Sequence, residues 1–178
     1  MIVGLFVGGR GRRMGGVDKS ALATREGPTI LERIERLVGE LGLPLVLVGE
    51  GAHASALPRI ADDPGGVGPI GGLSALLAHA GNGQVIALAC DMPYVTADDL
   101  RALAEHPSKA AVLAAKTDLG WEPLFARYDA PRVRPIAHAL ITEGRRALHA
   151  VIEQAGAEVF HVGDPQTLRD WDTPEDCG

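Results

Sequence analysis

The sequence has few cysteines, few aromatic residues and no long hydrophobic run. Its two cysteines, Cys90 and Cys177, give no disulfide framework, which suits a reducing cytoplasm. No run of apolar residues is long enough to cross a membrane, and no basic segment precedes the N-terminal apolar run, so we expect no signal peptide. A net charge of −6 and a pI near 5.5 argue against general nucleic-acid binding. We therefore expect a cytoplasmic protein with neither membrane nor nucleic-acid partners.

The remaining composition is that of an ordinary globular protein. Hydrophobic residues make up 46% of the chain and charged residues 22%. Aromatic residues contribute only 4%, so the core has to be built from Leu, Val, Ile and Ala. A chain of 178 residues is long enough for one domain with a proper core, and we expect a single domain over residues 1–178.

A glycine-rich, basic loop stands out directly after the first apolar run. Residues 2–7, IVGLFV, have the length and composition of a buried strand, and residues 8–19, GGRGRRMGGVDK, follow at once. Glycine lets backbone N–H groups approach a ligand closely, and this loop adds positive charge in an acidic chain. Its cations are Arg10, Arg12, Arg13 and Lys19. Close backbone approach together with concentrated positive charge favours a polyphosphate ligand over a merely solvated loop.

Two common phosphate-binding motifs do not describe this loop. No Gly-x-Gly-x-x-Gly of the required spacing leads at once into a helix, so it is not a dinucleotide fingerprint. Lys19 is followed by Ser20 but no glycine precedes Lys19, so it is not a P-loop. The loop therefore predicts phosphate binding of another kind.

Hydrophobic periodicity predicts alternating strands and helices along the rest of the chain. Capping-box spacing marks two helix starts, at Thr29 with Glu32 and at Thr96 with Asp99. Strands are expected at 2–7, 43–48, 59–61, 85–89, 110–115, 122–128 and 158–162. Helices are expected at 28–41, from a second glycine-rich loop at 64–73 to Ala80, at 96–105, 133–141 and 147–155, with a short helical piece at 52–57.

Such alternation predicts an α/β fold: a three-layer, mostly parallel, doubly wound (Rossmann-like) sheet. Ligands of these sheets sit beyond the carboxyl ends of the strands. The opening loop, Asp62 and Asp91 each come just after a predicted strand. We therefore expect them to lie at one edge of the molecule.

Asp91 is the best candidate for a metal ligand. A carboxylate at the end of a buried strand is costly unless it is paired or holds a metal, and Mg²⁺ prefers one or two carboxylates together with phosphate oxygens. The alternative is a cap of the turn before Pro93, and we favour the metal. For Asp62 and Asp63, we expect that one faces the nucleotide or the metal and that the other only starts the turn at Pro64.

No other chemistry is indicated by the sequence. The six histidines are scattered without metal-ligand spacing, and we expect each to be a surface or structural residue. No nucleophile elbow, Ser/His/Asp arrangement or zinc cluster is present. The lack of a covalent nucleophile fits direct phosphoryl or nucleotidyl transfer, in which a protein mainly positions groups and neutralises charge.

The residues resemble those of a known family, the molybdenum cofactor guanylyltransferases, nucleotidyltransferases of the nucleotide-diphospho-sugar transferase type. The resemblance covers essentially the whole chain in order. It rests on the loop at 8–19, IAD at 60–62, GPIGGL at 68–73, CDMP at 90–93, EPLF at 122–125, EGRR at 143–146 and DTPED at 172–176. It implies transfer of GMP from GTP to the phosphate of molybdopterin, with Mg²⁺ and release of pyrophosphate. It also implies transient contact with proteins that deliver the molybdenum cofactor or accept it.

The resemblance implies roles for individual residues on the nucleotide side. Phe6, Val7, Gly8 and Gly9 would contact the nucleotide through their backbone, with Gly49 and Asp62 nearby. Lys19 would neutralise the phosphates, and Arg13 would stabilise charge on the transferring phosphate. Asp91 would hold Mg²⁺ and touch GTP. Fixed cations and N–H donors aimed at the developing charge supply most of the catalysis in such a site.

On the acceptor side, the resemblance points to Arg145, Arg146 and the turn at 172–175, which begins with Asp172. The chain departs from the family pattern at three positions. Val7 stands where alanine is usual, Gly49 where asparagine is frequent, and Asp172 where asparagine is usual. These departures concern the acceptor and one contact to the guanosine more than the phosphate loop.

Two other functions remain open from the sequence. One is a related nucleotidyltransferase with another nucleotide or acceptor, such as a molybdopterin cytidylyltransferase. That branch tends to carry Ala-Ala-Gly in the loop and Asp-Gln-Pro after the fourth strand, whereas this chain has Gly8-Gly9 and Asp91-Met92-Pro93. The other is a non-catalytic nucleotide-binding module, which would have no need of Asp91, Lys19 and Arg13 together.

Overall fold

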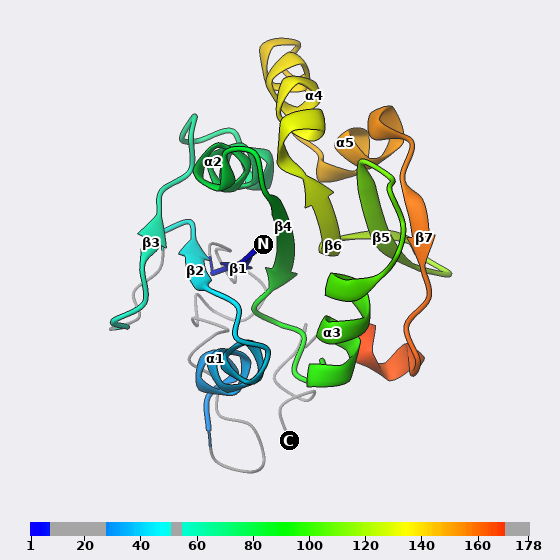
Figure 1. Ribbon diagram of the computed structural model, residues 1–178. Helices are drawn as coiled ribbons and strands as arrows, with labels where there is room; N and C mark the ends of the chain where they lie inside the picture. The colour runs from blue at the N-terminus through cyan, green and yellow to red at the C-terminus, as the bar shows by residue number, and fades with distance from the viewer. Residues whose placement is uncertain (8–27, 51–54, 170–178) are drawn as a thin grey trace.

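The computed structural model describes residues 1–7, 28–50 and 55–169. Gly8, Gly9, Arg13, Lys19 and Asp172, for which roles were predicted, lie outside these ranges. The described residues contain a seven-stranded sheet in the order β3-β2-β1-β4-β6-β5-β7 (Figure 1). Its strands are β1 Ile2–Phe6, β2 Leu45–Val48, β3 Arg59–Ile60, β4 Gln84–Ala89, β5 Val112–Thr117, β6 Gly120–Asp129 and β7 Glu158–Phe160.

The sheet is mostly parallel, as predicted. β1, β2, β3 and β4 run in the same direction, and β5 and β7 are parallel to each other. Only β6 reverses, and it pairs antiparallel with both β4 and β5. The carboxyl ends of β3, β2, β1 and β4 therefore lie side by side at one edge of the sheet.

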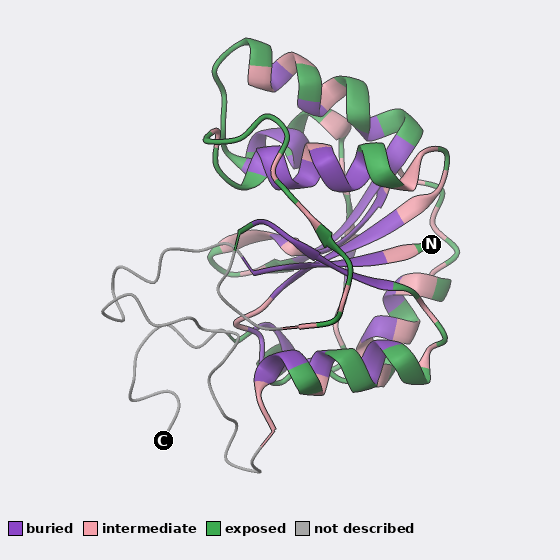
Figure 2. Ribbon diagram, turned by 90° about the vertical axis from the view of Figure 1, so that its left-hand side faces the viewer, coloured by how far each residue is buried: buried purple, intermediate pink, exposed green. Residues whose placement is uncertain are grey.

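Helices cover both faces of the sheet and complete three layers (Figure 2). One layer holds α2, α4 and α5, and the other holds α1 and α3 (Figure 1). Their bounds are α1 Ile30–Glu40, α2 Pro69–Ala80, α3 Ala97–Glu105, α4 Ala130–Thr142 and α5 Leu148–Ala155, and a 3₁₀ turn, η3, spans Pro165–Leu168. None of the helices in the described part of the chain is both long and apolar enough to cross a membrane.

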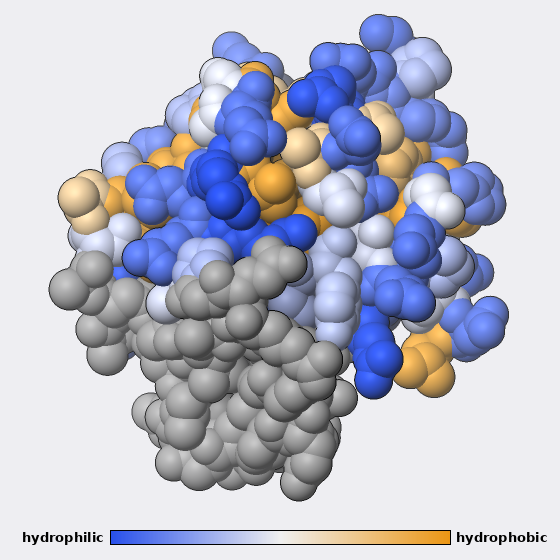
Figure 3. All heavy atoms as spheres, turned by 90° about the horizontal axis from the view of Figure 1, so that it is seen from below, coloured by the Kyte–Doolittle hydropathy of each residue, from blue (hydrophilic) through white to orange (hydrophobic). Residues whose placement is uncertain are grey.

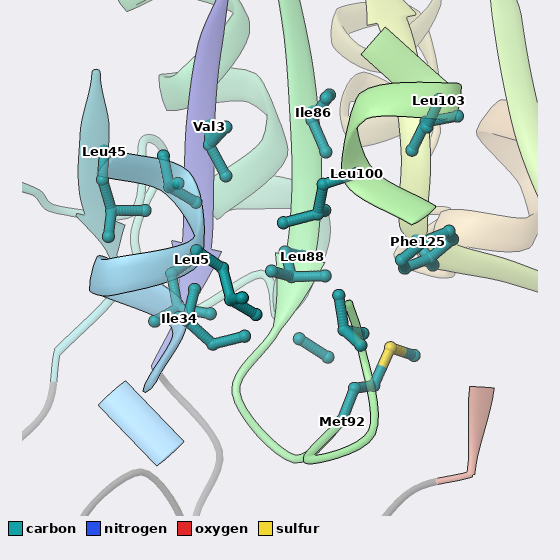
Figure 4. Packing of buried hydrophobic residues seen from close by; sticks show 14 of the residues in the cluster. Val3, Leu5, Ile34, Leu45, Ile86, Leu88, Met92, Leu100, Leu103 and Phe125 are labelled. Carbon is teal, nitrogen blue, oxygen red and sulfur yellow. The ribbon is translucent and has the colours of Figure 1, made fainter. Parts of the chain in front are cut away.

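Each face of the sheet has its own core, built as predicted from aliphatic residues. On the α1/α3 face, Leu5 of β1 and Leu88 of β4 belong to one buried cluster with Ile34 of α1 and Leu100 of α3 (Figure 4). On the other face, buried side chains of α2 such as Leu73 and Leu76 pack with residues of α4 and α5. Burial of both faces explains why the parallel strands read as continuous apolar runs.

The two predicted capping boxes are present and fix the starts of α1 and α3. Thr29 accepts a hydrogen bond from the Glu32 N–H, and the Glu32 carboxylate accepts one from the Thr29 N–H. Thr96 and Asp99 form the same reciprocal pair at α3. Each box satisfies two N–H groups that the first turn of a helix leaves without partners.

The helical piece predicted over 52–57 is wrong in the part that the structure describes, where residues 55–57 are not helical. Ser55 accepts a hydrogen bond from the Leu57 N–H through its Oγ, which competes with helical pairing. Pro58 follows, and proline disfavours the α conformation of the residue before it. Local side-chain and proline effects therefore outweigh the apolar pattern.

A buried arginine joins the sheet to the end of α3. Arg127 of β6 is only 4% exposed. Its guanidinium donates to the carbonyls of Leu103, Ala104, His106 and Ser108 at 2.9–3.1 Å. Because the last carbonyls of a helix have no partner within it, these bonds cap α3 from the sheet side. Burial lowers the pKa of Arg127, and the Glu158 carboxylate partly offsets this.

Candidate active site

The predicted strand-end residues do converge at one edge of the sheet. Phe6 and Val7 end β1, Gly49 follows β2, Asp62 follows β3, and Asp91 follows β4. These strands are neighbours in the sheet and point the same way. The structure therefore brings together the predicted nucleotide-side and metal residues that it describes, although Asp91 lies 85 positions after Phe6 in the sequence.

The backbone at the end of β1 is tied to both neighbouring strands. The N–H of Val7 donates to Val48 O at 3.0 Å, and Phe6 O accepts from the Cys90 N–H at 3.3 Å. These bonds hold the end of β1 against the ends of β2 and β4. A loop leaving this point begins at the strand edge where a ligand of the fold is expected.

Gly49 has a structural reason to be glycine. Its φ is +96°, in the left-handed region that favours glycine. Its N–H donates to Ile60 O at 2.9 Å, and its carbonyl accepts from the Arg59 guanidinium at 3.1 Å. The backbone of Gly49 thus links β2 to β3, while a contact to the nucleotide remains a prediction.

Asp62 lies against the first turn of α2. A Cβ added to Gly72 would come within 3.0 Å of Asp62 Oδ1 and of the Phe6 ring, and 2.9 Å from Val48. Glycine at position 72 is therefore what lets the Asp62 carboxylate approach the helix so closely. Burial raises the pKa of Asp62, and the neighbouring Glu50 carboxylate raises it further. A cation bound nearby would favour the ionised form.

A cavity of about 360 Å³ opens beside Asp91, on the other side of β4 from Asp62. It lies between the start of α2, the end of β4, the start of β6 and the start of α5. Its lining residues are Pro69, Ala89, Asp91, Met92, Glu122, Pro123, Leu124, Ala147, Leu148 and His149. Most of these are apolar, and the ionisable side chains among them are Asp91, Glu122 and His149.

Two helices begin beside this cavity without side-chain caps. Gly68 precedes α2 and Ala147 precedes α5, and neither provides a capping hydrogen bond, unlike Thr29, Thr96 and Asp129 at the other helices. The first residues of both helices line the cavity. The N-terminus of a helix carries partial positive charge and favours an anion, although Pro69 at the start of α2 contributes no N–H donor of its own.

The predicted acceptor residues Arg145 and Arg146 are exposed and directly precede the part of α5 that lines the cavity. Arg145 lies 4.0 Å from the Glu143 carboxylate, a weak exposed contact. Both arginines therefore lie in the segment that leads into the cavity wall. On the face seen from below, strongly hydrophilic side chains surround small hydrophobic areas (Figure 3).

Sequence reasoning missed two ionisable cavity residues. Glu122 was part of a matched motif but had no role, and His149 was expected to be a surface or structural residue. His149 is exposed and its ring bonds the Trp121 carbonyl at 3.1 Å, so that expectation is correct but incomplete, since the residue also lines the cavity. A signal for Glu122 was its position at the amino end of a predicted strand. A strand that runs antiparallel to β4 brings its amino end beside the carboxyl end of β4, where Asp91 lies.

Comparison with known proteins decides the family. The family model described as a MobA-like NTP transferase domain matches residues 4–159. The chain belongs to this family. This confirms the family predicted from the sequence, and the match includes the opening loop and both candidate aspartates.

Named relatives of this member of the family agree with one another. It is 31% identical to a probable molybdenum cofactor guanylyltransferase of Methanothermobacter thermautotrophicus, over 98% of this chain and 95% of the relative. It is 32% identical to a molybdenum cofactor guanylyltransferase of Pseudomonas syringae, over 96% of this chain and 88% of the relative.

Solved structures show the same fold. The crystal structure of molybdopterin-guanine dinucleotide biosynthesis protein A from Archaeoglobus fulgidus superimposes with a TM-score of 0.81 at 25% identity, covering 99% of this chain and 95% of that one. A 2-C-methyl-D-erythritol 4-phosphate cytidylyltransferase from Thermus thermophilus reaches 0.69 at 14% identity, over 98% and 94%, and it supports the fold alone.

The residues at the end of β4 fit Mg²⁺. Within the described ranges no three His, Cys, Asp or Glu side chains gather as a metal cluster. Mg²⁺ does not need one when phosphate oxygens and water fill most of its coordination positions. A single carboxylate from Asp91, in a cavity bordered by two uncapped helix N-termini, is a suitable protein contribution.

Proposed function

We propose that the protein transfers GMP from GTP to the terminal phosphate of molybdopterin and releases pyrophosphate. Membership of the MobA-like family and the relatives named molybdenum cofactor guanylyltransferase support the reaction. The observation that carries the proposal is the position of Asp91 between two binding regions. Phe6, Gly49 and Asp62 lie at the strand ends on one side, and the cavity lined by Asp91, Glu122 and His149 lies on the other.

Two ligands that react with each other have to meet at such a junction. The nucleotide would lie over the ends of β1, β2 and β3, with its α-phosphate near Asp91. The acceptor would occupy the cavity between β4, β6 and α5, with its phosphate toward the uncapped N-termini. Arg145 and Arg146 would bind the anionic acceptor where the chain enters α5.

The chemistry asks mainly for positioning and charge neutralisation. An oxygen of the acceptor phosphate attacks the α-phosphorus of GTP, and the bond to the β-phosphate breaks as pyrophosphate leaves. The attacking phosphate is already an anion, so no strong general base is needed. Asp91 would hold Mg²⁺, which when bound neutralises charge on the triphosphate. Lys19 and Arg13, outside the described residues, would add fixed positive charge, and Asp172 would belong to the acceptor side.

Molybdopterin is thus the proposed small-molecule partner, with transient contact to proteins that deliver or receive the molybdenum cofactor. We place the protein in the cytoplasm as a single domain over residues 1–178, in keeping with the supply of GTP there and with the two-cysteine composition.

The reaction is tested by pyrophosphate release with Mg²⁺ and each nucleoside triphosphate, with and without molybdopterin. Release only with GTP and molybdopterin together is the expected result. Equal release with CTP would replace guanylyl by a broader nucleotidyl transfer. Absence of release with every nucleotide in the presence of molybdopterin would contradict the proposed function and favour a nucleotide-binding module.

A further inference from the structure

β6 contains a bulge at the wall of the cavity. Ala114 and Ala115 are consecutive on β5, yet they pair with Ala126 and Glu122 of β6. The three residues between those two, 123–125, therefore have no counterpart on β5. Bulges re-aim side chains and are over-represented beside active sites. This one places Glu122, Pro123 and Leu124 in the cavity lining.

Three side chains from different elements hold the bulge. The hydroxyl of Tyr128, which is fully buried, donates to Pro123 O at 2.7 Å. His149 of α5 bonds Trp121 O at 3.1 Å, and since a carbonyl only accepts, Nε2 carries the hydrogen. Thr117 of β5 donates to Glu122 Oε1 at 3.3 Å. The position of Glu122 is thus fixed by β5, β6 and α5 together.

The chemistry of this wall suits a flat heterocycle with an edge of N–H donors. Pro123, Leu124, Leu148 and Met92 supply apolar surface, and Glu122 supplies a carboxylate. A carboxylate has two acceptor oxygens and can accept a pair of parallel hydrogen bonds. The 2-amino-4-oxo pyrimidine ring presents an amino group beside a ring N–H. This pair of donors matches the two acceptor oxygens of a carboxylate.

We propose that Glu122 recognises the pterin ring of the acceptor by accepting hydrogen bonds from its 2-amino group and the adjacent ring N–H. The inference rests on the proposed function, because it takes the cavity as the acceptor site. Tyr128, Thr117 and His149 are positioning residues that hold the bulge. Guanine carries the same donor edge, but the residues predicted for the nucleotide lie at the ends of β1, β2 and β3, whereas Glu122 lies across β4 from them.

The register of β4 and β6 places Glu122 on the same side of β4 as the cavity. The last β4–β6 pair is Leu88 with Phe125. Asp91 lies three positions after Leu88, and Glu122 three positions before Phe125, so both residues lie toward the same edge of the sheet. Glu122 is therefore on the acceptor side of the junction, within the same cavity as Asp91.

A binding comparison tests the recognition directly. The probes are pterin and lumazine, which share the ring system, but lumazine has a carbonyl in place of the 2-amino group. Fluorescence titration should show that the wild-type protein binds pterin at least about tenfold more tightly than lumazine, since the site loses charge-assisted hydrogen bonds with the analogue. Glu122→Gln should lose most of this preference, because an amide offers one acceptor and one donor group in place of two acceptors. Glu153→Gln, an exposed change on α5, is the matched control and should keep it.

Steady-state kinetics separate this inference from the proposed function. Glu122→Gln should raise KM for molybdopterin about tenfold or more and leave KM for GTP unchanged. A rise in KM for GTP instead would assign Glu122 to guanine and overturn the inference. So would a wild-type protein that binds neither probe or both equally, or a variant that keeps the preference. If the preference depends on Glu122 but no nucleotide is transferred to molybdopterin, pterin recognition stands and the proposed reaction falls.

Discussion

Asp91 is the residue on which the two halves of the proposed site meet. Asp91→Asn keeps the size of the side chain and removes its charge. We expect kcat to fall at least about 100-fold, because the carboxylate proposed to hold Mg²⁺ at the transferring phosphate is lost. Pyrophosphate release measures this, and a thermal melt checks the fold.

Asp98→Asn is a suitable control for Asp91, since Asp98 is an exposed carboxylate in α3 that pairs only weakly with Arg101. It should leave turnover unchanged. Near-normal activity of Asp91→Asn with an unchanged melt would remove Asp91 from the mechanism.

Asp62 should make the stability of the protein depend on pH. Its pKa is raised by burial and, secondarily, by Glu50. A carboxyl with a higher pKa folded than unfolded stabilises the folded state most below its unfolded pKa, and this contribution is lost as pH rises through the folded pKa. The melting temperature of Asp62→Asn should therefore rise relative to that of the wild type as the pH increases from about 4 to about 7.

The neighbouring exposed Asp63 supplies the matched variant, Asp63→Asn, for loss of a carboxylate in the same loop. If the melting temperature of Asp62→Asn does not rise relative to that of the wild type with increasing pH, the raised pKa of Asp62 does not affect folding.

At the scale of elements, Arg127 connects β6 to the end of α3. Arg127→Met would leave four carbonyls without their buried donor. We expect a loss of about 2–5 kcal/mol in the free energy of unfolding, measured by urea denaturation. Arg132→Met removes an exposed guanidinium bonded to the single carbonyl of Lys109 and should cost less than about 1 kcal/mol. Equal losses in the two variants would contradict the capping role.

The β6 bulge depends on Tyr128 in a comparable way. Burial raises the pKa of Tyr128, so its hydroxyl stays protonated and donates to Pro123 O. Tyr128→Phe removes only that hydroxyl and should cost about 1–3 kcal/mol of stability, because the carbonyl is left unsatisfied. KM for molybdopterin should also rise while KM for GTP does not. A stability loss with both KM values unchanged would make Tyr128 purely structural.

Elements with a local sequence signal were predictable. Features whose geometry depends on contacts with other strands or helices were not. The pairs Thr29 with Glu32 and Thr96 with Asp99 indicate the starts of their helices, because each capping box is complete within four residues. The bulge in β6 has no such signal, since it exists only relative to β5 and is held by Tyr128 and by His149 on another element. In the same way, the sequence indicated Asp62 and Asp91 by their place after strands, but the cavity beside Asp91 depends on how α5 packs against β6.

For the molecule as a whole, β4 separates the two proposed binding regions. Strands β1, β2 and β3 would position the nucleotide side, while the start of α2, the end of β4, β6 and α5 line the cavity. The doubly wound sheet was predictable from the alternation of strands and helices, and it fixes the edge at which the site lies. The division of that edge into two sides follows from the reversed strand β6, which turns its amino end toward Asp91.

The most direct test of this account is the nucleotide and acceptor dependence of pyrophosphate release by the wild-type protein with Mg²⁺. The account predicts release with GTP and molybdopterin together, with a molybdopterin guanine dinucleotide as the second product, and none when either substrate is left out. Release from GTP at the same rate without molybdopterin, or none with both present, would contradict it.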